Sequence, residues 1–347
     1  MRWFQQPGID TIREMISGSL PGAPPSRLFG SGPTDVGLGK VTFSMPVTRW
    51  LEDSLGIVEP AIFALFADAP VASALWSALP EGKVATTSEL NMSFLRPVTR
   101  ATERLVGFAE TVHLGRQVGL ANLRITDQNG RLMAHATTRC LIADVPVDFD
   151  GELDPPDTGP NDPADPYLRD PPGPDLYWPQ EWITTLTPTE LMKRSTASEN
   201  GSGMGPVARL TGLEPVFAAG GRSQVTLPTS PWFSNGGPAI YGGVLAWLAD
   251  LTMGAAAYSL LDVGGLNAPL DLNVRYVRPA LINSGRLTAE ARVIHQGNRL
   301  RVLQAEVRSE EQKPVAVATS SMLVLPNGAF DLIEGKPAHE IIGGSDA

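Results

Sequence analysis

Two stretches of this sequence, LNMSFLRP at residues 90–97 and LNVRYVRP at residues 272–279, carry Leu, Asn, Arg and Pro at the same places. They lie 182 residues apart, and the same offset relates further landmarks. These pairs are Trp50 and Trp232, Ala64 and Ala246, Asp68 and Asp250, His113 and His295, Gly115 and Gly297, and Thr137 and Thr319. A constant offset needs almost no insertions between the copies, so the sequence predicts a tandem duplication of one domain.

Each copy has the same expected order of elements. A short strand, at 40–45 or 223–227, comes before a long apolar helix within 57–79 or 239–261. Alternating runs separated by turn residues then predict strands at 86–94, 103–113, 118–127 and 131–143, and at 270–277, 286–295, 301–309 and 314–325. This order predicts an α+β domain in which an antiparallel sheet wraps around one long helix.

The composition of the connecting segments sets the expected domain boundaries. We expect an N-terminal extension at 1–35, a first domain at 36–145, a linker at 146–212, a second domain at 213–327 and a C-terminal tail at 328–347. The linker is rich in Pro, Asp and Gly, which suits an extended connection. Within it, TPTE at 187–190 has the pattern of a capped helix start.

Charge and cysteine content narrow the classes of function and the compartment. The chain of 347 residues has a formal net charge of −10 and a pI near 5.0, which argues against nucleic acid as a partner. Asp68 and Asp250 interrupt the two longest apolar stretches, so we expect buried helices and no membrane span. The single cysteine, Cys140, excludes an internal disulfide and favours a cytoplasmic location. The spacing of Cys and His predicts no metal site.

Each copy has a helix containing Ala-Asp, followed by Leu-Asn-x-x-(Phe/Tyr)-x-Arg-Pro and His-x-Gly. This pattern resembles the hotdog-fold acyl-CoA thioesterases, in particular the subgroup whose helix begins with His-Gly-Gly. The second copy matches at Asn235 and at Tyr241-Gly242-Gly243, where Tyr241 stands in place of the family's His. The first copy has Glu59-Pro60-Ala61 at that place. The resemblance covers residues 41–143 and 223–325.

The resemblance implies two tandem hotdog domains that form a pseudo-dimer within one chain, with the active site between them. It implies hydrolysis of an acyl-CoA, or of an acyl group on a carrier protein, with no cofactor. A role in lipid metabolism and assembly of pseudo-dimers into a homo-oligomer are further expectations. Neither the acyl group nor the oligomeric state follows from the sequence.

Thioester hydrolysis needs a donor for the oxyanion and a carboxylate that directs water or attacks the carbonyl. Gly242 at the helix start offers a backbone N–H at the positive end of the helix dipole. Asp250 lies eight residues further on, about 12 Å along the helix, so the carboxylate must come from the other copy as Asp68. By the resemblance, Thr87 assists this carboxylate and Asn235 orients substrate or water. We therefore expect Asp68, Thr87, Asn235 and Gly242 as catalytic residues.

Further residues are expected to bind substrate. Tyr241 can donate a hydrogen bond but cannot take a proton near neutral pH as His does. Arginine suits the phosphates of coenzyme A through its forked geometry. The expected substrate-binding residues are Tyr241, Gly243, Arg116, Arg275 and Arg299, with Arg278 as another candidate.

The second composite site would combine Asp53, Glu59 and Pro60 with Asp250 and Pro269. Proline has no N–H to donate, Pro269 has no hydroxyl, and a carboxylate at Glu59 would repel an oxyanion. We expect this site to be degenerate, which leaves one functional site per chain.

Other interpretations remain open. The two aspartates could be structural carboxylates, the glycines could serve helix packing, and the arginines could be ordinary surface charges. His113 and His295 are expected to pack at turns. The main alternative function is a non-catalytic acyl-CoA binding or sensing protein. A hotdog dehydratase would need a His on the helix, and neither helix has one.

Overall fold

We describe a computed structural model of the chain, covering residues 5–99, 101–145, 170–197 and 203–329. Residues 146–169 and 198–202 of the predicted linker (146–212), and the predicted tail from 330 on, lie outside these residues. The predicted helix start at 187–190 is confirmed. Thr187 and Glu190 form a capping box at the start of α5 (Pro188–Thr196).

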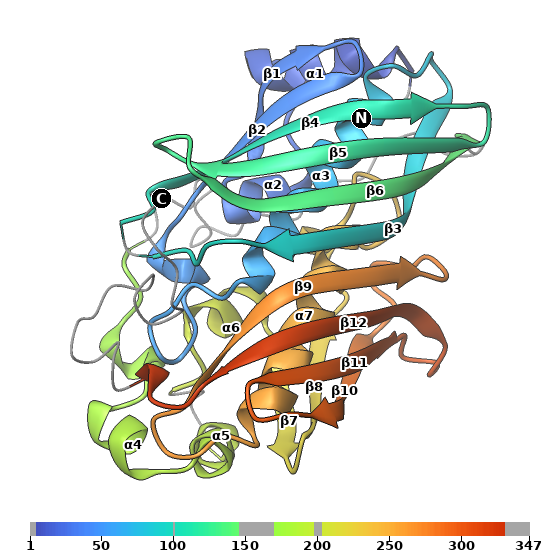
Figure 1. Cartoon of the computed structure of the whole chain (residues 1–347). Helices are drawn as coiled ribbons and strands as arrows, with labels where there is room; N and C mark the ends of the chain where they lie inside the picture. The colour runs from blue at the N-terminus through green and yellow to red at the C-terminus, as the bar shows by residue number, and fades with distance from the viewer. Residues whose placement is uncertain (1–4, 100, 146–169, 198–202, 330–347) are drawn as a thin grey trace.

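The described residues form one antiparallel sheet of twelve strands, with both long helices against one face (Figure 1). The strand order is β1-β2-β4-β5-β6-β3-β9-β12-β11-β10-β8-β7, so the second half repeats the first half in reverse. The first copy contributes β1 (Gly32–Gly37), β2 (Lys40–Pro46), β3 (Lys83–Phe94), β4 (Arg104–Leu114), β5 (Val118–Asp127) and β6 (Leu132–Asp144). The second contributes β7 (Glu214–Ala219), β8 (Arg222–Pro228), β9 (Leu266–Tyr276), β10 (Arg286–Gln296), β11 (Leu300–Arg308) and β12 (Pro314–Leu325).

The two halves join where β3 pairs antiparallel with β9 at the centre of the sheet (Figure 1). In this register Asn91 lies opposite Asn273, which is the same position in the other copy. A residue that faces its own repeat equivalent marks a pseudo-twofold axis. The predicted pseudo-dimer of two tandem domains is therefore present in one chain.

The two central helices, α3 (Ala61–Trp76) and α7 (Gly242–Tyr258), are apolar on almost every side because they pack against the sheet and against each other. Asp68 and Asp250 are the buried acidic residues of these helices, with 4% and 3% of their surface exposed. Since a buried carboxylate needs partners, their surroundings decide what each can do. Among the described residues, no helix is both long and apolar enough to cross a membrane.

The outermost strands β1 and β7 are the elements that the sequence prediction missed. Both are edge strands, and each contains a proline, Pro33 or Pro215. Proline in a strand is tolerated at an edge because its missing N–H can face outward. The first domain therefore begins within the predicted extension, which also holds α1 (Gly8–Ser17) and α2 (Pro24–Phe29). The linker region adds α4 (Gln180–Thr185) and α6 (Pro206–Thr211) to α5.

Candidate functional site

The N-terminus of α7 meets the middle of α3, so that the two copies build one site together. The Gly243 N–H donates a hydrogen bond to Asp68 Oδ2 at 3.1 Å, and the Gly242 N–H is directed at the same carboxyl group. Helix N-termini have N–H groups without intrahelical partners and attract negative charge. The N-cap residue of α7, Tyr241, supplies no side-chain cap. Asp68 thus caps α7 from the other copy.

Glycine at both positions lets the two helices approach this closely. A Cβ atom on Gly242 would lie 2.7 Å from Asp68 Oδ2. A Cβ atom on Gly243 would lie 2.6 Å from the backbone oxygen of Leu65. Neither distance is possible for a real side chain, so the contact between the carboxylate and the helix end depends on bare backbone.

The other oxygen of Asp68 is held by the first copy itself. Thr87 Oγ1 donates to Asp68 Oδ1 at 2.7 Å. Burial raises the pKa of the Asp68 carboxyl above its ordinary value, and the hydrogen bonds from Thr87, Gly243 and Gly242 partly oppose this rise. Cys140 lies beside Thr87, and burial raises the pKa of its thiol to about 12, so it stays protonated.

The structure gives Tyr241 a different position from the one expected. Its hydroxyl accepts a hydrogen bond from the Ala69 N–H at 2.6 Å and donates one to the Leu65 carbonyl at 2.9 Å. The single O–H donor of this side chain is therefore occupied by the backbone of α3. The expectation that this hydroxyl donates to substrate does not match the geometry.

Asn235 lies in the loop before α7 and is exposed. Its Oδ1 accepts a hydrogen bond from the Gly237 N–H at 2.9 Å within the same loop. Asp53 holds the matching loop of the first copy through the Leu55 and Ile57 N–H groups, at 2.8 Å and 3.0 Å. This geometry supports a loop-stabilising role, and an orienting role for Asn235 toward substrate stays a prediction.

The predicted second site comes together as a group of buried acids without the donors of the first. Asp250 Oδ1 and Glu59 Oε2 have no hydrogen-bond partner among the described residues. Pro60 and Pro269 stand at the positions of Gly242 and Thr87. Burial, then the charge of Asp271, raises the pKa of Asp250 to about 7.

The pKa values of the other two acids in this group are also raised. Burial, opposed by backbone hydrogen bonds and reinforced by the charge of Glu52, brings the pKa of Asp53 to about 7. Burial and the charges of Asp53 and Asp250 hold the pKa of Glu59 well above its usual range. We call Asp53, Glu59 and Asp250 the acidic cluster. With pKa values of about 7, Asp53 and Asp250 are about half protonated at neutral pH, and among the described residues the cluster has no oxyanion donor of the Gly242 kind.

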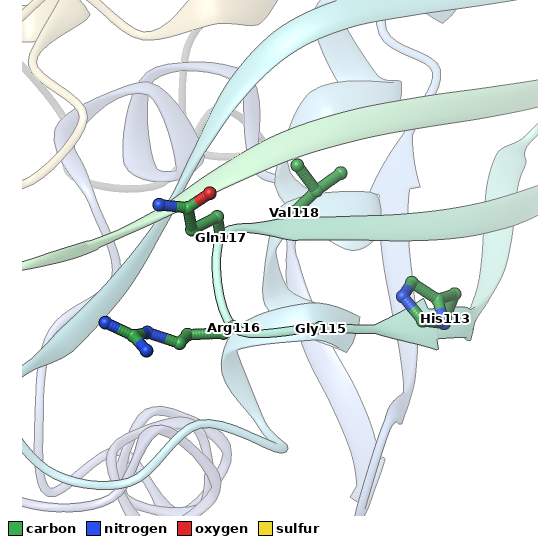
Figure 2. Close-up of a pocket in the computed structure, with 5 residues that line it drawn as sticks. All are labelled: His113, Gly115, Arg116, Gln117 and Val118. Carbon is green, nitrogen blue, oxygen red and sulfur yellow. The ribbon is translucent and has the colours of Figure 1, made fainter.

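The three expected arginines lie in three different places. Arg116 is in the β4–β5 turn, where residues 113 and 115–118 line a shallow hollow of about 500 Å³ (Figure 2). This turn leads into Gly119, which packs on Leu75, one to two helical turns beyond Asp68 on α3. Arg116 therefore belongs to the Asp68 side of the molecule.

The structure does not bring Arg275 and Arg299 to Asp68. Arg275 pairs with Glu89 at 3.2 Å across the β3–β9 junction. Since its neighbour Val274 is fully buried against the helices, Arg275 points from the opposite face of the sheet. Arg299 directly precedes β11, in which Arg301 donates to the Ala257 carbonyl near the end of α7 at 2.6 Å. It therefore lies on the Asp250 side.

Sequence reasoning missed one contact of the site and one feature of α3. Tyr276 donates a hydrogen bond to the Gly242 carbonyl at 3.0 Å and so holds the first peptide of α7. The repeat contained a signal for this, because Phe94 stands at the same position in the first copy and has no hydroxyl. The second feature is Pro70 inside α3.

Among the described residues, no group of three or more His, Cys, Asp or Glu side chains is placed to hold a metal ion.

The family model of the thioesterase superfamily matches the chain twice, at residues 55–134 and 237–316. The two matches are themselves 182 residues apart. The acyl-coenzyme A thioesterase PaaI of Escherichia coli is 30% identical over 110 residues, which cover 32% of this chain and 76% of that protein. The chain belongs to the thioesterase superfamily.

Two further relatives extend the comparison of this thioesterase-family chain. A provisionally named esterase of Haemophilus influenzae is 37% identical over 87 residues, which are 25% of this chain and 61% of that protein. A solved structure from Alicyclobacillus acidocaldarius, described as having a hot dog fold, covers 87% of this chain and 98% of its own, with 14% identity and a TM-score of 0.55. The predicted tandem hotdog architecture and the thioester hydrolase class are confirmed at the level of the family. Membership of the His-Gly-Gly subgroup stays a prediction.

Proposed function

We propose that this chain hydrolyses acyl-CoA thioesters at one composite site, where Asp68 of the first copy meets the N-terminus of α7 from the second. The contact between Asp68 and the Gly243 N–H carries this proposal, because it joins a buried carboxylate to backbone donors at a helix end. The relative PaaI, named as an acyl-coenzyme A thioesterase, supports coenzyme A as the carrier. The single cysteine supports a reducing, cytoplasmic setting.

In the proposed reaction, Asp68 acts as general base or as nucleophile. As a base it takes a proton from water, whose oxygen forms a bond to the thioester carbon. The C–S bond then breaks, and the coenzyme A thiolate leaves. The proton that Asp68 took from water passes to this thiolate. The raised pKa of Asp68 suits this role, since a base works best when its pKa is near the working pH.

The oxyanion is stabilised by the Gly242 N–H. In the substrate-free chain this N–H and that of Gly243 both face Asp68, and the Gly243 bond is the one with good geometry. A bound carbonyl oxygen therefore takes over the Gly242 N–H while Gly243 and Thr87 keep hold of the carboxylate. This exchange removes one donor that lowers the pKa of Asp68, so substrate binding makes the carboxylate a stronger base.

One observation favours a second function, acyl-CoA binding without turnover. The donor that an oxyanion needs is occupied by Asp68 in the substrate-free chain, and the Tyr241 hydroxyl is tied to α3. If the carboxylate does not release Gly242, substrate is held but not hydrolysed.

Free-thiol release from short, long and aromatic acyl-CoAs tests the proposal, with calorimetric binding measured on the same panel. We expect release of coenzyme A from at least one member, at a rate well above the uncatalysed reaction. Binding of a member without release would favour the sensing function. Neither binding nor release across the panel would contradict both.

Thr87→Val should shift the pH profile of this reaction. The change removes the hydrogen bond that lowers the pKa of Asp68, so this pKa rises and the carboxylate is ionised only at higher pH. The acid limb of the kcat profile then moves to higher pH. Below it, kcat falls about tenfold, since a hydrogen bond to a charged group is worth about 1.5–3 kcal/mol.

Thr138→Val is the matched control for this prediction. Thr138 is also buried, but its hydroxyl donates to the Glu89 carbonyl at 2.7 Å and does not bond Asp68. We expect its pH profile to match the wild type. An unshifted profile for Thr87→Val would show that Thr87 has no influence on the reacting carboxylate.

A further inference from the structure

The Tyr241 hydroxyl makes hydrogen bonds to both polar groups of one turn of α3. In an uninterrupted α-helix the Ala69 N–H would bond the Leu65 carbonyl directly. Here the hydroxyl accepts from the first group at 2.6 Å and donates to the second at 2.9 Å. A side chain of one copy thereby bridges one turn of the other copy's central helix.

Pro70 explains why α3 accepts such a bridge. Its ring crowds the backbone N–H of the residue before it, which is Ala69. It also has no N–H for the carbonyl four residues earlier. An inserted side chain is an established cause of a local opening in a helix. The bridged turn from Leu65 to Ala69 is the one that carries Asp68.

The second composite site lacks both parts of this arrangement. Thr252 stands at the position of Pro70, and its hydroxyl bonds the Leu248 carbonyl of its own helix at 2.6 Å. Glu59 stands at the position of Tyr241, and its Oε2 has no partner among the described residues. The proline and the bridging hydroxyl therefore occur together, on the side of the molecule where the carboxylate is fully hydrogen-bonded.

We propose that Tyr241 is a positioning residue, whose hydroxyl holds open the Pro70 turn of α3 so that Asp68 faces both Gly243 and Thr87. The inference rests on the proposed function in taking Asp68 as the reacting carboxylate. A tyrosine hydroxyl suits this task because it donates and accepts at once. Burial and the nearby Asp68 keep the pKa of Tyr241 well above its usual value, so the hydroxyl remains a donor across the working pH range.

A double-mutant cycle of Tyr241→Phe and Pro70→Ala tests the positioning role. In the native background, Tyr241→Phe should lower kcat about tenfold to a hundredfold, since a misplacement of about 1 Å can cost 100-fold, while KM changes little. In the Pro70→Ala background the helix can close its own hydrogen bond, so the same change should cost far less. An equal loss in both backgrounds would mean that the hydroxyl acts on substrate, which overturns the inference.

Tyr258→Phe is the matched control for this cycle. Tyr258 is a partly buried tyrosine at the far end of α7, where it stacks on Trp178, away from the Asp68 turn. We expect its removal to leave kcat close to the wild-type value. This comparison separates a specific effect of Tyr241 from the general loss of a buried hydroxyl.

A second measurement decides the inference even if the chain hydrolyses no thioester. The titration of Asp68 can be followed by NMR of ¹³C-carboxyl-labelled aspartates and assigned with Asp68→Asn. Tyr241→Phe should raise the pKa of Asp68, because the relaxed turn weakens its bonds to Gly243 and Thr87. Pro70→Ala with Tyr241→Phe should bring it back toward the wild-type value. Identical titration of Asp68 in Tyr241→Phe and wild type would overturn the positioning role, whatever the outcome for turnover.

Discussion

Asp68→Asn is expected to lower kcat/KM for thioester hydrolysis about 10²- to 10⁴-fold, the range typical of a general base, whereas Asp250→Asn should remain close to the wild-type rate. The two aspartates occupy the same position in the repeat and are buried to the same degree. Asp68 receives hydrogen bonds from Gly243 and Thr87, whereas Asp250 Oδ1 has no partner among the described residues. At the second site, Pro60 replaces the equivalent of Gly242 and Pro269 replaces the equivalent of Thr87, so Asp250 lacks both donors.

The pair of variants is its own control, because each replaces one buried carboxyl group at equivalent places in the repeat. An asparagine at position 68 keeps an oxygen that can accept one hydrogen bond, so acyl-CoA binding should survive in Asp68→Asn. Thermal unfolding of both variants shows whether a lost cap on α7 contributes to the result. Activity lost in Asp250→Asn alone would place the reaction at the acidic cluster, and equal partial losses would indicate two working sites.

Most of the fold could be predicted from the repeat, because each central element appears in both copies. Two copies in register indicated the long helices and the order of helix and strands along each half, and the resemblance implied the pseudo-dimer. The resemblance implied a pseudo-dimer without naming the strands that join its halves, and the structure shows that β3 pairs with β9, with Asn91 facing Asn273. The edge strands β1 and β7 escaped because glycine and proline at Gly32, Pro33 and Pro215 hide the alternation that marks a strand.

The site was predictable where helix geometry alone decides it. The rise of a helix excludes Asp250 as the partner of Gly242, which leaves Asp68, and the structure joins Asp68 to Gly243 at 3.1 Å. The role of Tyr241 was not predictable, because it depends on a break in a helix of the other copy. The residues next to Tyr241 do not reveal this role, because Pro70 lies in the other copy.

The protonation of the second site was also beyond the sequence. The expectation that Glu59 would repel an oxyanion assumed an ionised carboxylate. Burial and mutual repulsion within the acidic cluster hold the pKa of Glu59 well above its usual range. The site is unsuitable for the reaction because it lacks donors, and its acids carry less negative charge at neutral pH than ordinary carboxylates do.

The acidic cluster makes the protein less stable as the pH rises. Asp250 and Asp53 have pKa values of about 7 in the folded chain, against an ordinary 3.8. The folded state therefore binds protons that the unfolded state has already lost between pH 4 and 7. The free energy of unfolding falls across this window and levels off above it. Each group contributes on the order of a few kcal/mol, at about 1.4 kcal/mol for each unit of pKa difference.

Asp53→Asn and Asp250→Asn should each raise the thermal midpoint at pH 8 by about 2 °C or more and leave it nearly unchanged at pH 4 to 5. For Asp53 the second copy supplies the precedent, since Asn235 accepts the equivalent backbone hydrogen bond through its Oδ1. Asp127→Asn is the matched control with the opposite sign. Against the effect of burial, hydrogen bonds from Arg131 and Asn129 lower the pKa of Asp127. Its stabilisation is therefore present above the ordinary pKa, and the substitution should destabilise at pH 8.

Thermal unfolding of the wild type and the three variants between pH 4 and 9 measures all of these effects together. The wild-type midpoint should decline between pH 5 and 8, with a shallower decline in Asp53→Asn and Asp250→Asn. A double variant should gain less than the sum of the two single variants, because Asp53 and Asp250 both act on Glu59 and are coupled through it. Destabilisation at pH 8 in both single variants would show that the ionised carboxylates are stabilised by partners in the folded chain, which contradicts the raised pKa values.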